Sequence, residues 1–519
     1  MNTRPATLLA GLAVVACSAL TACGAPDTGG SASTTLYTES TAAPTSFDPA
    51  RARAGDDFVV DSLLYDTLVA RDDDGLVPAL ATEWTEDSAS SYTFTIRDDA
   101  TCADGTAITP TVVADSLKYF ANNDAGDHVF SPLVFGPGKP TITADDAAGT
   151  VSIELSEPYA VLPAGLAIPQ SGIICPAGLK DPEGLANGTV EGAFSGPYAL
   201  GETKPGVSYT YELRKGYDAW PEFAEPLTGK PASKLVFSIA TDQATAANKL
   251  LSGDLQIANL GGENIDRVSK GDFNRVKTII ANVYVMFNER PGHFFADNAE
   301  ARQAVARAID RDAYNNVFSA GKADLFNSIV PSSYACALDD ESLIEPHDPA
   351  AAASVLKGAK IKMVASTAFG DSGKGAEYLQ AVLTDAGAKV DLQKVDNATW
   401  ATETQKPNGD WDITFMGDIN AGRIISASLD RVLGTPLEKG GRNIPGVDNA
   451  PAAEALKQGL QTADVDAQCE AFETAQRLLL ERDDVVPLSG VTWETTSASN
   501  VTVRAPGGNL NYRTVRIED

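Results

Sequence analysis

The amino-acid sequence predicts an α/β fold, because short apolar runs with strand character alternate with stretches in which apolar residues recur at helical spacing. The clearest unit has a strand at 360–366, a helix at 373–386 and a second strand at 388–395. This order predicts a right-handed crossover that joins two parallel strands. The 519 residues are enough to build more than one hydrophobic core.

The other strands are expected in the same alternation along the chain. Residues 91–97 alternate strictly between apolar and polar side chains, which is typical of a half-buried strand. Residues 283–288 are a short run with strand character, so we expect a short strand there. The remaining strands are expected at 36–38, 234–239 and 412–416, and in a β-rich tail at 500–518.

Helices are expected where apolar residues recur three or four positions apart. Thr109 and Pro110 are the residue types favoured at the N-cap and at the first helical position, so a helix should begin there. Gly253 and Asp254 end the helix that precedes them. The expected helices lie at 61–69, 110–119, 242–252, 298–309, 452–460 and 467–482.

The first 22 residues have the features of an export signal. Arg4 precedes an apolar stretch at 6–22, which is short for a membrane span and ends in Leu20-Thr21-Ala22-Cys23-Gly24. This ending resembles the lipobox of bacterial lipoproteins, in which the cysteine accepts a lipid and the preceding segment is removed. We therefore expect a signal peptide at 1–22, with a plain signal peptide or a single anchor as the alternatives. Residues 23–34 are too poor in apolar side chains to fold and should form a flexible leash behind the lipidated Cys23.

The charge balance argues against two classes of partner. The chain has 40 basic and 70 acidic residues, a net charge of −30. Nucleic-acid binding depends on Lys and Arg, so an acidic chain is a poor candidate for it. Docking on anionic lipid by charge is disfavoured for the same reason. Strong acidity suits a soluble exported protein.

Four cysteines remain in the mature chain after Cys17 leaves with the signal and Cys23 takes the lipid: Cys102, Cys175, Cys336 and Cys469. An even number in an oxidising compartment predicts two disulfides, for which the sequence alone permits three pairings. Free buried thiols are the alternative. No two of these cysteines are close in sequence and none lies beside a histidine, so metal binding is not expected.

Catalytic and cofactor motifs are missing from the sequence. The loop Gly370-Asp371-Ser372-Gly373 looks like a serine-protease nucleophile loop, but the three histidines His128, His293 and His347 lie in no companion motif. We interpret the loop as a polar connection that leads into a helix. Likewise, residues 72–75 form a turn rather than a calcium loop, because the EF-hand ligand spacing is absent. We expect no enzyme activity, no cofactor and no metal.

Several stretches occur together in one order that resembles extracellular solute-binding protein family 5, the peptide- and nickel-binding group that serves ABC importers. The match runs from about residue 36 to residue 490. The stretches are Tyr65-Asp66-Thr67-Leu68-Val69, Pro78-Ala79-Leu80-Ala81 with Trp84, Tyr92-Thr93-Phe94-Thr95-Ile96-Arg97, Asp104-Gly105-Thr106, Ser195-Gly196-Pro197-Tyr198, Leu250-Leu251-Ser252-Gly253-Asp254, Arg302-Gln303-Ala304-Val305, Ala308-Ile309-Asp310-Arg311 and Val486-Pro487-Leu488.

The resemblance implies a two-lobed, flytrap-like α/β fold of the periplasmic-binding-protein type, which closes on its ligand. Lobe I would hold 35–281, with an extra subdomain at about 68–199. Lobe II would hold 282–487, and 488–519 would return to lobe I, with crossings near 282–288 and 486–491. Pairing Cys102 with Cys175 and Cys336 with Cys469 would keep each disulfide within one lobe.

The resemblance also implies a ligand site between the lobes. Peptide-binding members use an aspartate to pair with the amino terminus of the ligand, and Asp418 matches it at the end of residues 411–418. The following residues Ile419 to Gly422, including Asn420, depart from the usual Asp-Pro pair, which counts against a peptide and indicates another ligand. Glu39 and Thr41, after the first strand, should line the cleft. Trp400, which precedes residues 411–418, is a candidate to stack on the ligand, with a position in the core as the alternative.

These inferences lead to one functional hypothesis. The protein should be a monomeric lipoprotein, held by lipid on the extracytoplasmic face of the cell membrane. It should capture a peptide or similar small solute and deliver it to ABC permease subunits. A ligand-sensing lipoprotein is the first alternative and an exported hydrolase is the second. Nickel is disfavoured as the ligand, because the histidines are scattered and transition metals favour imidazole or thiolate ligands.

Overall fold

The computed structural model describes residues 34–123, 125–240, 242–368 and 373–518. The expected signal peptide, Cys23 and the leash at 23–34, apart from its last residue, lie outside the described residues. Of the polar loop expected at Gly370-Asp371-Ser372-Gly373, the first three residues also lie outside the described residues.

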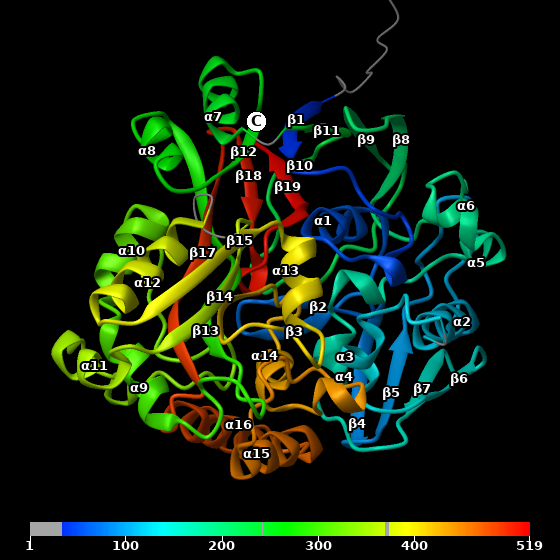
Figure 1. Ribbon diagram of the computed structural model, residues 1–519. Helices are drawn as coiled ribbons and strands as arrows, with labels where there is room; N and C mark the ends of the chain where they lie inside the picture. Colours follow the sequence, from blue (N-terminus) through cyan, green and yellow to red (C-terminus); the bar gives the residue numbers. More distant parts are fainter. Residues whose placement is uncertain (1–33, 124, 241, 369–372, 519) are drawn as a thin grey trace, which may run out of the picture.

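A six-stranded mixed sheet extends through the middle of the molecule in the order β12-β17-β13-β16-β14-β15. Two long strands, β13 and β17, pair antiparallel along almost their whole length and pass from one half of the molecule to the other (Figure 1). The strands are β12 (Ile257–Leu260), β13 (Phe273–Phe287), β14 (Lys360–Ser366), β15 (Lys389–Val395), β16 (Ile413–Asp418) and β17 (Val485–Ala498). The molecule is thus a two-lobed α/β structure in which β13 and β17 belong to both lobes.

The strand–helix–strand unit predicted at 360–395 is confirmed. The parallel strands β14 and β15 flank helix α12 (Lys374–Asp385), and Ile361 pairs with Val390 in the shared register. The prediction of a short strand at 283–288 is wrong in extent, because β13 begins at Phe273. Its first half is mostly exposed or partly buried and its second half is continuously buried, so the predicted strand at 283–288 covers only part of the buried half.

Four further sheets lie beside the central one. Two of them have four strands each, in the orders β1-β11-β9-β8 and β4-β5-β7-β6, and the second falls within the segment expected as a subdomain. The strands are β1 (Thr35–Ser40), β2 (Val69–Asp72), β3 (Gly75–Pro78), β4 (Ala81–Ser88), β5 (Ser91–Ile96), β6 (Thr141–Asp145), β7 (Thr150–Glu154), β8 (Tyr198–Lys204), β9 (Ser208–Leu213), β10 (Lys230–Pro231), β11 (Lys234–Ile239), β18 (Val501–Arg504) and β19 (Asn511–Ile517).

Helices cover the sheets on the outside (Figure 1). Helix α7 illustrates how the sequence sets their limits, since Asp242 accepts backbone N–H bonds at its start and Gly253 ends it in the left-handed conformation. The helices are α1 (Gly55–Leu64), α2 (Pro110–Ala121), α3 (Ser131–Phe135), α4 (Leu162–Gly165), α5 (Pro176–Lys180), α6 (Pro182–Ala186), α7 (Gln243–Ser252), α8 (Asn264–Val268), α9 (Ala299–Ala308), α10 (Arg311–Ser319), α11 (Pro349–Leu356), α12, α13 (Asn397–Thr404), α14 (Ile425–Leu433), α15 (Ala450–Gln461) and α16 (Val465–Leu480).

The helix predicted at 61–69 is wrong at both ends. Helix α1 starts earlier, at Gly55, and ends at Leu64, after which Tyr65 is extended. The carboxylate of Asp66 is buried and forms an ion pair with Arg513 of β19 at 2.9 Å. Because this ion pair holds Asp66 against β19, the helix ends before it, although apolar residues continue at helical spacing up to Val69. Val69 is instead the first residue of β2.

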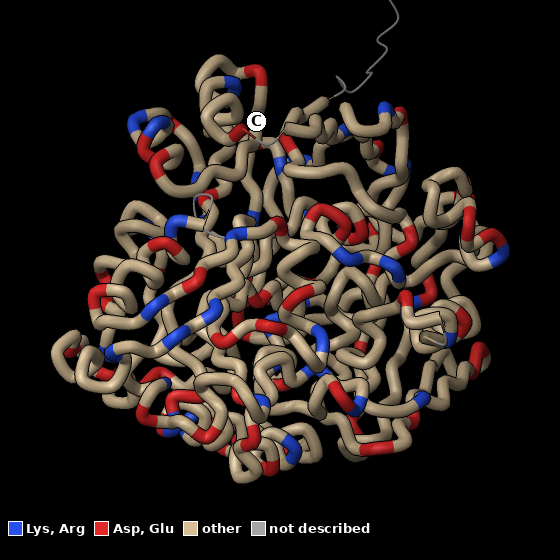
Figure 2. Tube along the Cα trace, viewed as in Figure 1, with Lys and Arg blue, Asp and Glu red and all other residues tan. Residues whose placement is uncertain are grey.

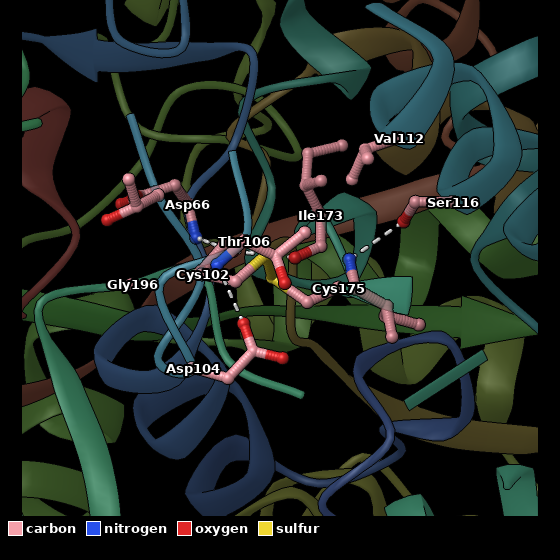
Figure 3. Close-up of a disulfide and its surroundings, with 12 residues drawn as sticks. Asp66, Cys102, Asp104, Thr106, Val112, Ser116, Ile173, Cys175 and Gly196 are labelled. Atoms are coloured by element: carbon pink, nitrogen blue, oxygen red, sulfur yellow. Dashed lines mark hydrogen bonds between the residues drawn. A yellow bond between two sulfur atoms is a disulfide. The ribbon is translucent and has the colours of Figure 1, made fainter. Parts of the chain in front are cut away.

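Both disulfide pairings implied by the resemblance are confirmed. Cys102 bonds to Cys175 and Cys336 bonds to Cys469. Figure 3 shows the first of these, beside Ser116 of α2, whose hydroxyl accepts a bond from the backbone N–H of Ile174 at 2.8 Å. This disulfide therefore joins the loop before α2 to the segment that packs on α2.

Acidic residues are spread along the whole described Cα trace, with basic residues interspersed among them (Figure 2). In the described part of the chain, no helix combines the length and the apolar character needed to cross a bilayer.

Candidate ligand-binding site

A cavity of about 420 Å³ opens where the two lobes meet at the middle of β13. This volume is in the range that holds one small organic molecule. Its walls come from the loop after β1, from α1 and β2, from α7 and β12, from the end of β16 and the loop after it, and from the turn before β19. Segments that are far apart in the sequence therefore build one site.

Aromatic side chains form a large part of the cavity wall. Tyr512 is held in place by two bonds, because its hydroxyl lies 3.0 Å from Asn259 Nδ2 and 3.3 Å from Thr38 Oγ1. Phe237 contacts Tyr512 edge to face, with ring centroids 5.0 Å apart. The aromatic residues of the wall are Phe58, Tyr65, Phe237, Tyr334, Trp493 and Tyr512. Such a wall suits a ligand with an apolar or planar body.

Glu39 and Thr41 line the cavity, where the sequence placed them. Glu39 forms an ion pair with Lys249 Nζ at 2.5 Å. Thr41 donates its hydroxyl to Asp56 Oδ2 at 2.7 Å, and its backbone N–H also points to this carboxylate. Burial nevertheless raises the pKa of Asp56, against the lowering effect of the Thr41 bonds. Both acids of this wall are thus already engaged within the protein.

Asp418 also lines the cavity, at the end of β16, and its side chain is only 1% exposed. It is not a free carboxylate. Arg431 Nε lies 2.6 Å from Asp418 Oδ1, and Ser428 donates its hydroxyl to Oδ2. Both partners come from α14, so the ion pair ties the end of β16 to that helix. Beside it, burial raises the pKa of Tyr284 well above its ordinary value.

Asn420 lines the cavity at the start of the loop after β16. Its amide is used within that loop, since Nδ2 donates to the carbonyl of Ile424 at 2.8 Å and to Ser428 Oγ at 2.9 Å. Its Oδ1 accepts from the backbone N–H of Ile424 at 3.2 Å. Asn420 therefore shapes the loop that presents the backbone of Ala421 and Gly422 to the cavity.

Trp400 does not take part in the cavity wall. It is 4% exposed and its indole Nε1 donates to Thr414 Oγ1 at 2.8 Å, within the core beside β14 and β16. An indole at this position completes the packing between α13 and the central sheet. The aromatic residue that does face the cavity from β17 is Trp493.

Arg71, on β2, lines the cavity and was not singled out by the sequence. Its side chain packs over Gly507, where a Cβ atom would collide with it. Arg423 packs in the same way against Gly508, and its guanidinium lies 5.4 Å above the ring of Tyr334. Two arginines therefore lie side by side against a turn that only small residues can form. No local sequence signal marks them, because they are far apart in the chain.

Metal binding finds no support in the described residues, among which no group of three or more His, Cys, Asp or Glu side chains has the arrangement needed to hold an ion. The histidines lie apart from the cavity. His128 contacts the carbonyl of Phe120, and His293 lies 3.4 Å from Asp412.

Comparison with known proteins identifies the family. The family model described as "Bacterial extracellular solute-binding proteins, family 5 Middle" matches residues 75–427, more than half of the chain. A probable peptide ABC transporter periplasmic-binding protein from Sinorhizobium fredii is 25% identical over 446 residues, which are 80% of this chain and 82% of the relative. A probable D,D-dipeptide-binding periplasmic protein from Escherichia coli is 25% identical over 470 residues, 84% of this chain and 85% of the relative.

A solved structure is similar over nearly the whole chain. It is a substrate binding protein from Microbacterium hydrocarbonoxydans complexed with 4-hydroxybenzoate hydrazide. The two chains are 38% identical with a TM-score of 0.81, and the match covers 93% of this chain and 100% of the other.

Proposed function

The chain belongs to the bacterial extracellular solute-binding proteins of family 5, and on this premise we propose that the solute it captures is a peptide or a comparable small organic molecule. Its role is to bind a solute for an ABC importer, and it is not an enzyme. The observation that carries the proposal is the cavity of about 420 Å³, which has aromatic walls and polar groups from both lobes. A cavity of this size excludes a folded partner and admits one small ligand.

Three similar proteins support the breadth of this solute class. The Sinorhizobium and Escherichia proteins bear peptide and dipeptide names. The Microbacterium protein, which is more similar in sequence, holds an aryl hydrazide. Peptides and aryl hydrazides share an amide-like plane next to an apolar group, and the aromatic wall of this cavity suits both.

We propose that the solute is captured by closure of two lobes. Lobe I comprises 35–281, with the subdomain at about 68–199, and lobe II comprises 282–487, with 488–519 returning to lobe I. The crossings at 282–288 and 486–491 lie on β13 and β17, where the register of the pair shifts near Val283 and Tyr284. A short, paired crossing allows hinge motion without loss of the sheet. Each disulfide lies within one of these lobes and leaves closure free.

We propose that the protein is anchored by lipid on Cys23, which follows the small residues of a lipobox-like segment. The Gly- and Ser-rich leash would let a monomeric body reach permease subunits on the extracytoplasmic face of the membrane. Detergent partitioning of the protein from cells that express the native chain, compared with Cys23→Ser, tests this directly. The native chain should enter the detergent phase and the variant should not. Equal partitioning would refute the anchor.

We propose that Asp418 receives an ammonium group when the solute is a peptide. Because Arg431 already neutralises Asp418, the ammonium would share the carboxylate with Arg431 rather than replace it. Closure of the lobes would remove water from this contact and strengthen it.

The test is a thermal-shift screen of the mature chain carrying Cys23→Ser, with di- to pentapeptides, amino acids, aryl hydrazides, sugars, polyamines and nickel. A ligand present at 100 times its dissociation constant stabilises the folded state by about 2.7 kcal/mol, which is a shift of a few degrees for a chain of this size. Peptides or aryl hydrazides should shift the unfolding temperature. A response to sugars, polyamines or nickel alone would contradict the proposed solute class.

Asp418→Ala tests the residue, with Asp410→Ala as the matched control, because Asp410 is exposed and pairs with Lys362 away from the cavity. Asp418→Ala should abolish the shift caused by peptides, and Asp410→Ala should preserve it. Since loss of Asp418 also strands Arg431, Ser428→Ala serves as a milder second variant. An unchanged peptide shift in both Asp418→Ala and Ser428→Ala would remove Asp418 from the site.

A further inference from the structure

The charges that line the cavity are engaged within the protein, with one exception among the described residues. Glu39 pairs with Lys249 and Asp418 pairs with Arg431. Arg513, on the same wall, pairs with Asp66 at 2.9 Å.

The two remaining carboxylates of the wall are also satisfied. Asp56 accepts both the hydroxyl and the backbone N–H of Thr41. Asp242 caps α7, where it accepts from the backbone N–H of Ala244 and from the hydroxyl of Thr245, each at 2.9 Å. The bond from Thr245 lowers the pKa of Asp242, so it remains ionised as a helix cap. Arg71 is not among the hydrogen-bond partners of either carboxylate.

Arg71 is the exception, because its guanidinium makes no ion pair and no side-chain hydrogen bond in the described structure, although it is partly buried. The neighbouring acids face elsewhere. Asp72 Oδ2 accepts from the backbone N–H of Ala224 at 2.7 Å, and Asp73 accepts from the backbone N–H of Gly507 at 2.9 Å. The guanidinium is only partly buried and lines the cavity, so its donors are open to a ligand acceptor.

Arg423 adds a second positive charge behind this wall. All of its bonds go to neutral groups: Nε donates to Asn509 Oδ1 at 3.0 Å, and Nη2 donates to the carbonyls of Ile279 and Gly508. Burial, and then the charge of Arg423, lower the pKa of Arg71 to about 10, so Arg71 stays protonated at neutral pH. Among the described residues, neither Arg71 nor Arg423 forms an ion pair, so this end of the cavity carries two positive charges without an acidic partner.

We infer that Arg71 binds an anionic group of the solute, and that the solute is an organic acid whose carboxylate faces Arg71 while its apolar body lies on the aromatic wall. This inference rests on the proposed function and specifies its solute. Arg423 is a positioning residue, which holds the turn at Gly508 and supplies the second charge. The carboxylate can be the C-terminus of a peptide or that of a simple aryl acid, because the guanidinium fork fits both.

The experiment compares acids with their uncharged amides by isothermal titration of the mature chain carrying Cys23→Ser. The probes are 4-hydroxybenzoate against 4-hydroxybenzamide, and the dipeptide Ala-Phe against its C-terminal amide. Because a hydrogen bond to a charged group contributes about 1.5–3 kcal/mol, the acid of at least one pair should bind about 10- to 100-fold more tightly than its amide. The pair that shows the preference identifies the source of the carboxylate.

Three variants assign the preference to its residue. Arg71→Gln should reduce the ratio between acid and amide to about one, and Arg71→Lys should keep part of it, because a lysine retains the charge without the fork. Arg477→Gln is the matched control, since this arginine pairs with Asp340 on the outer face of α16. It should leave the ratio unchanged.

The outcomes separate this inference from the proposed function. Equal affinity for acid and amide in both pairs, or a preference that survives in Arg71→Gln, overturns the inference while solute binding stands. If none of the four probes binds but neutral solutes shift the unfolding temperature in the screen, the solute is not an acid and the inference is overturned alone. If the screen also finds no peptide or hydrazide ligand, the proposed solute class fails with it.

Discussion

The buried charges beside β17 and the charges at the Arg71 end of the cavity are balanced in different ways. Beside β17, Arg302 lies 3.2 Å from Glu289 and 3.1 Å from Asp484, and Asp484 also accepts from Asn449 at 2.8 Å. At the cavity, Arg71 faces a second arginine and has no acidic partner in the described chain. The first region is an internal network in which Glu289 and Asp484 both contact the Arg302 guanidinium, and the second has, among the described residues, no acidic group paired with its arginines.

This difference separates structural charge from binding charge. A buried ion pair contributes little net stability over an apolar replacement, but removal of one partner strands the other at high cost. The partly exposed guanidinium of Arg71 contributes little to the stability of the free protein and gains its partner only when the ligand arrives. Substitutions in the two regions should therefore have opposite signatures, with stability lost in the first and affinity lost in the second.

The largest expected effect is that of Arg302→Met. It would leave Glu289 and Asp484 without their shared cation, and we expect the free energy of unfolding to fall by about 3–5 kcal/mol. Urea unfolding followed by circular dichroism measures this, and titration of the folded variant should give an unchanged dissociation constant. A loss below about 1 kcal/mol would show that the network contributes far less than its burial indicates.

A smaller loss of stability is expected for Arg423→Gln, since its bonds join the loop after β16 to the turn before β19. Loss of hydrogen bonds made by a charged group should cost about 1–3 kcal/mol. Urea unfolding of this variant beside Arg71→Gln checks the division of roles. Equal stability of the two variants would contradict a positioning role for Arg423.

Stability should depend on pH through the network beside β17. Burial, and then the charge of Asp484, raise the pKa of Glu289 to about 8. Between its ordinary pKa and about 8, Glu289 is protonated in the folded chain and ionised in the unfolded chain. Unfolding then releases a proton, so the free energy of unfolding should fall by about 1.4 kcal/mol for each unit of rising pH.

Chemical denaturation at about pH 6 and about pH 7.5 measures this slope. Glu289→Gln should remove the contribution of one proton from this slope. Glu377→Gln is the control and should leave the slope unchanged, because Glu377 lies in an exposed ion pair with Lys394. A slope that is identical in the native chain and in Glu289→Gln would place the titration elsewhere.

The smallest effect on stability is expected for Arg71→Gln. Because Arg71 makes no ion pair or side-chain hydrogen bond in the described structure, its loss should change the free energy of unfolding by less than about 0.5 kcal/mol, as for other residues without such contacts. Thermal unfolding without ligand measures the change. A large destabilisation would mean that Arg71 has a structural partner, and the contrast between the two regions would disappear.

Local signals carried the prediction of many elements. The cap residues Asp242 and Gly253 set the limits of α7, and Thr109 with Pro110 set the start of α2. Tertiary contacts decided the rest. Helix α1 ends where Asp66 meets Arg513, a residue near the other end of the chain.

The candidate site was predicted only in part. As for the helices, tertiary contacts decided what the sequence could not predict. Glu39, Thr41, Asp418 and Asn420 line the cavity, since each lies at the end of β1 or β16 or just after it. Their partners are set by the fold, so the ion pair between Asp418 and Arg431 has no local signature. Arg71 was missed for this reason, because an unpaired arginine can be recognised only when every neighbouring carboxylate has been placed.

The most direct test of solute binding in this cavity uses Trp493, which lines it from β17. A solute found in the thermal-shift screen should change the tryptophan fluorescence of the mature chain in a saturable way. In Trp493→Phe that change should largely vanish, while isothermal titration still reports binding, within about tenfold of the native affinity because the ring is conserved. An undiminished fluorescence change in Trp493→Phe would place the solute elsewhere on the protein and contradict the account.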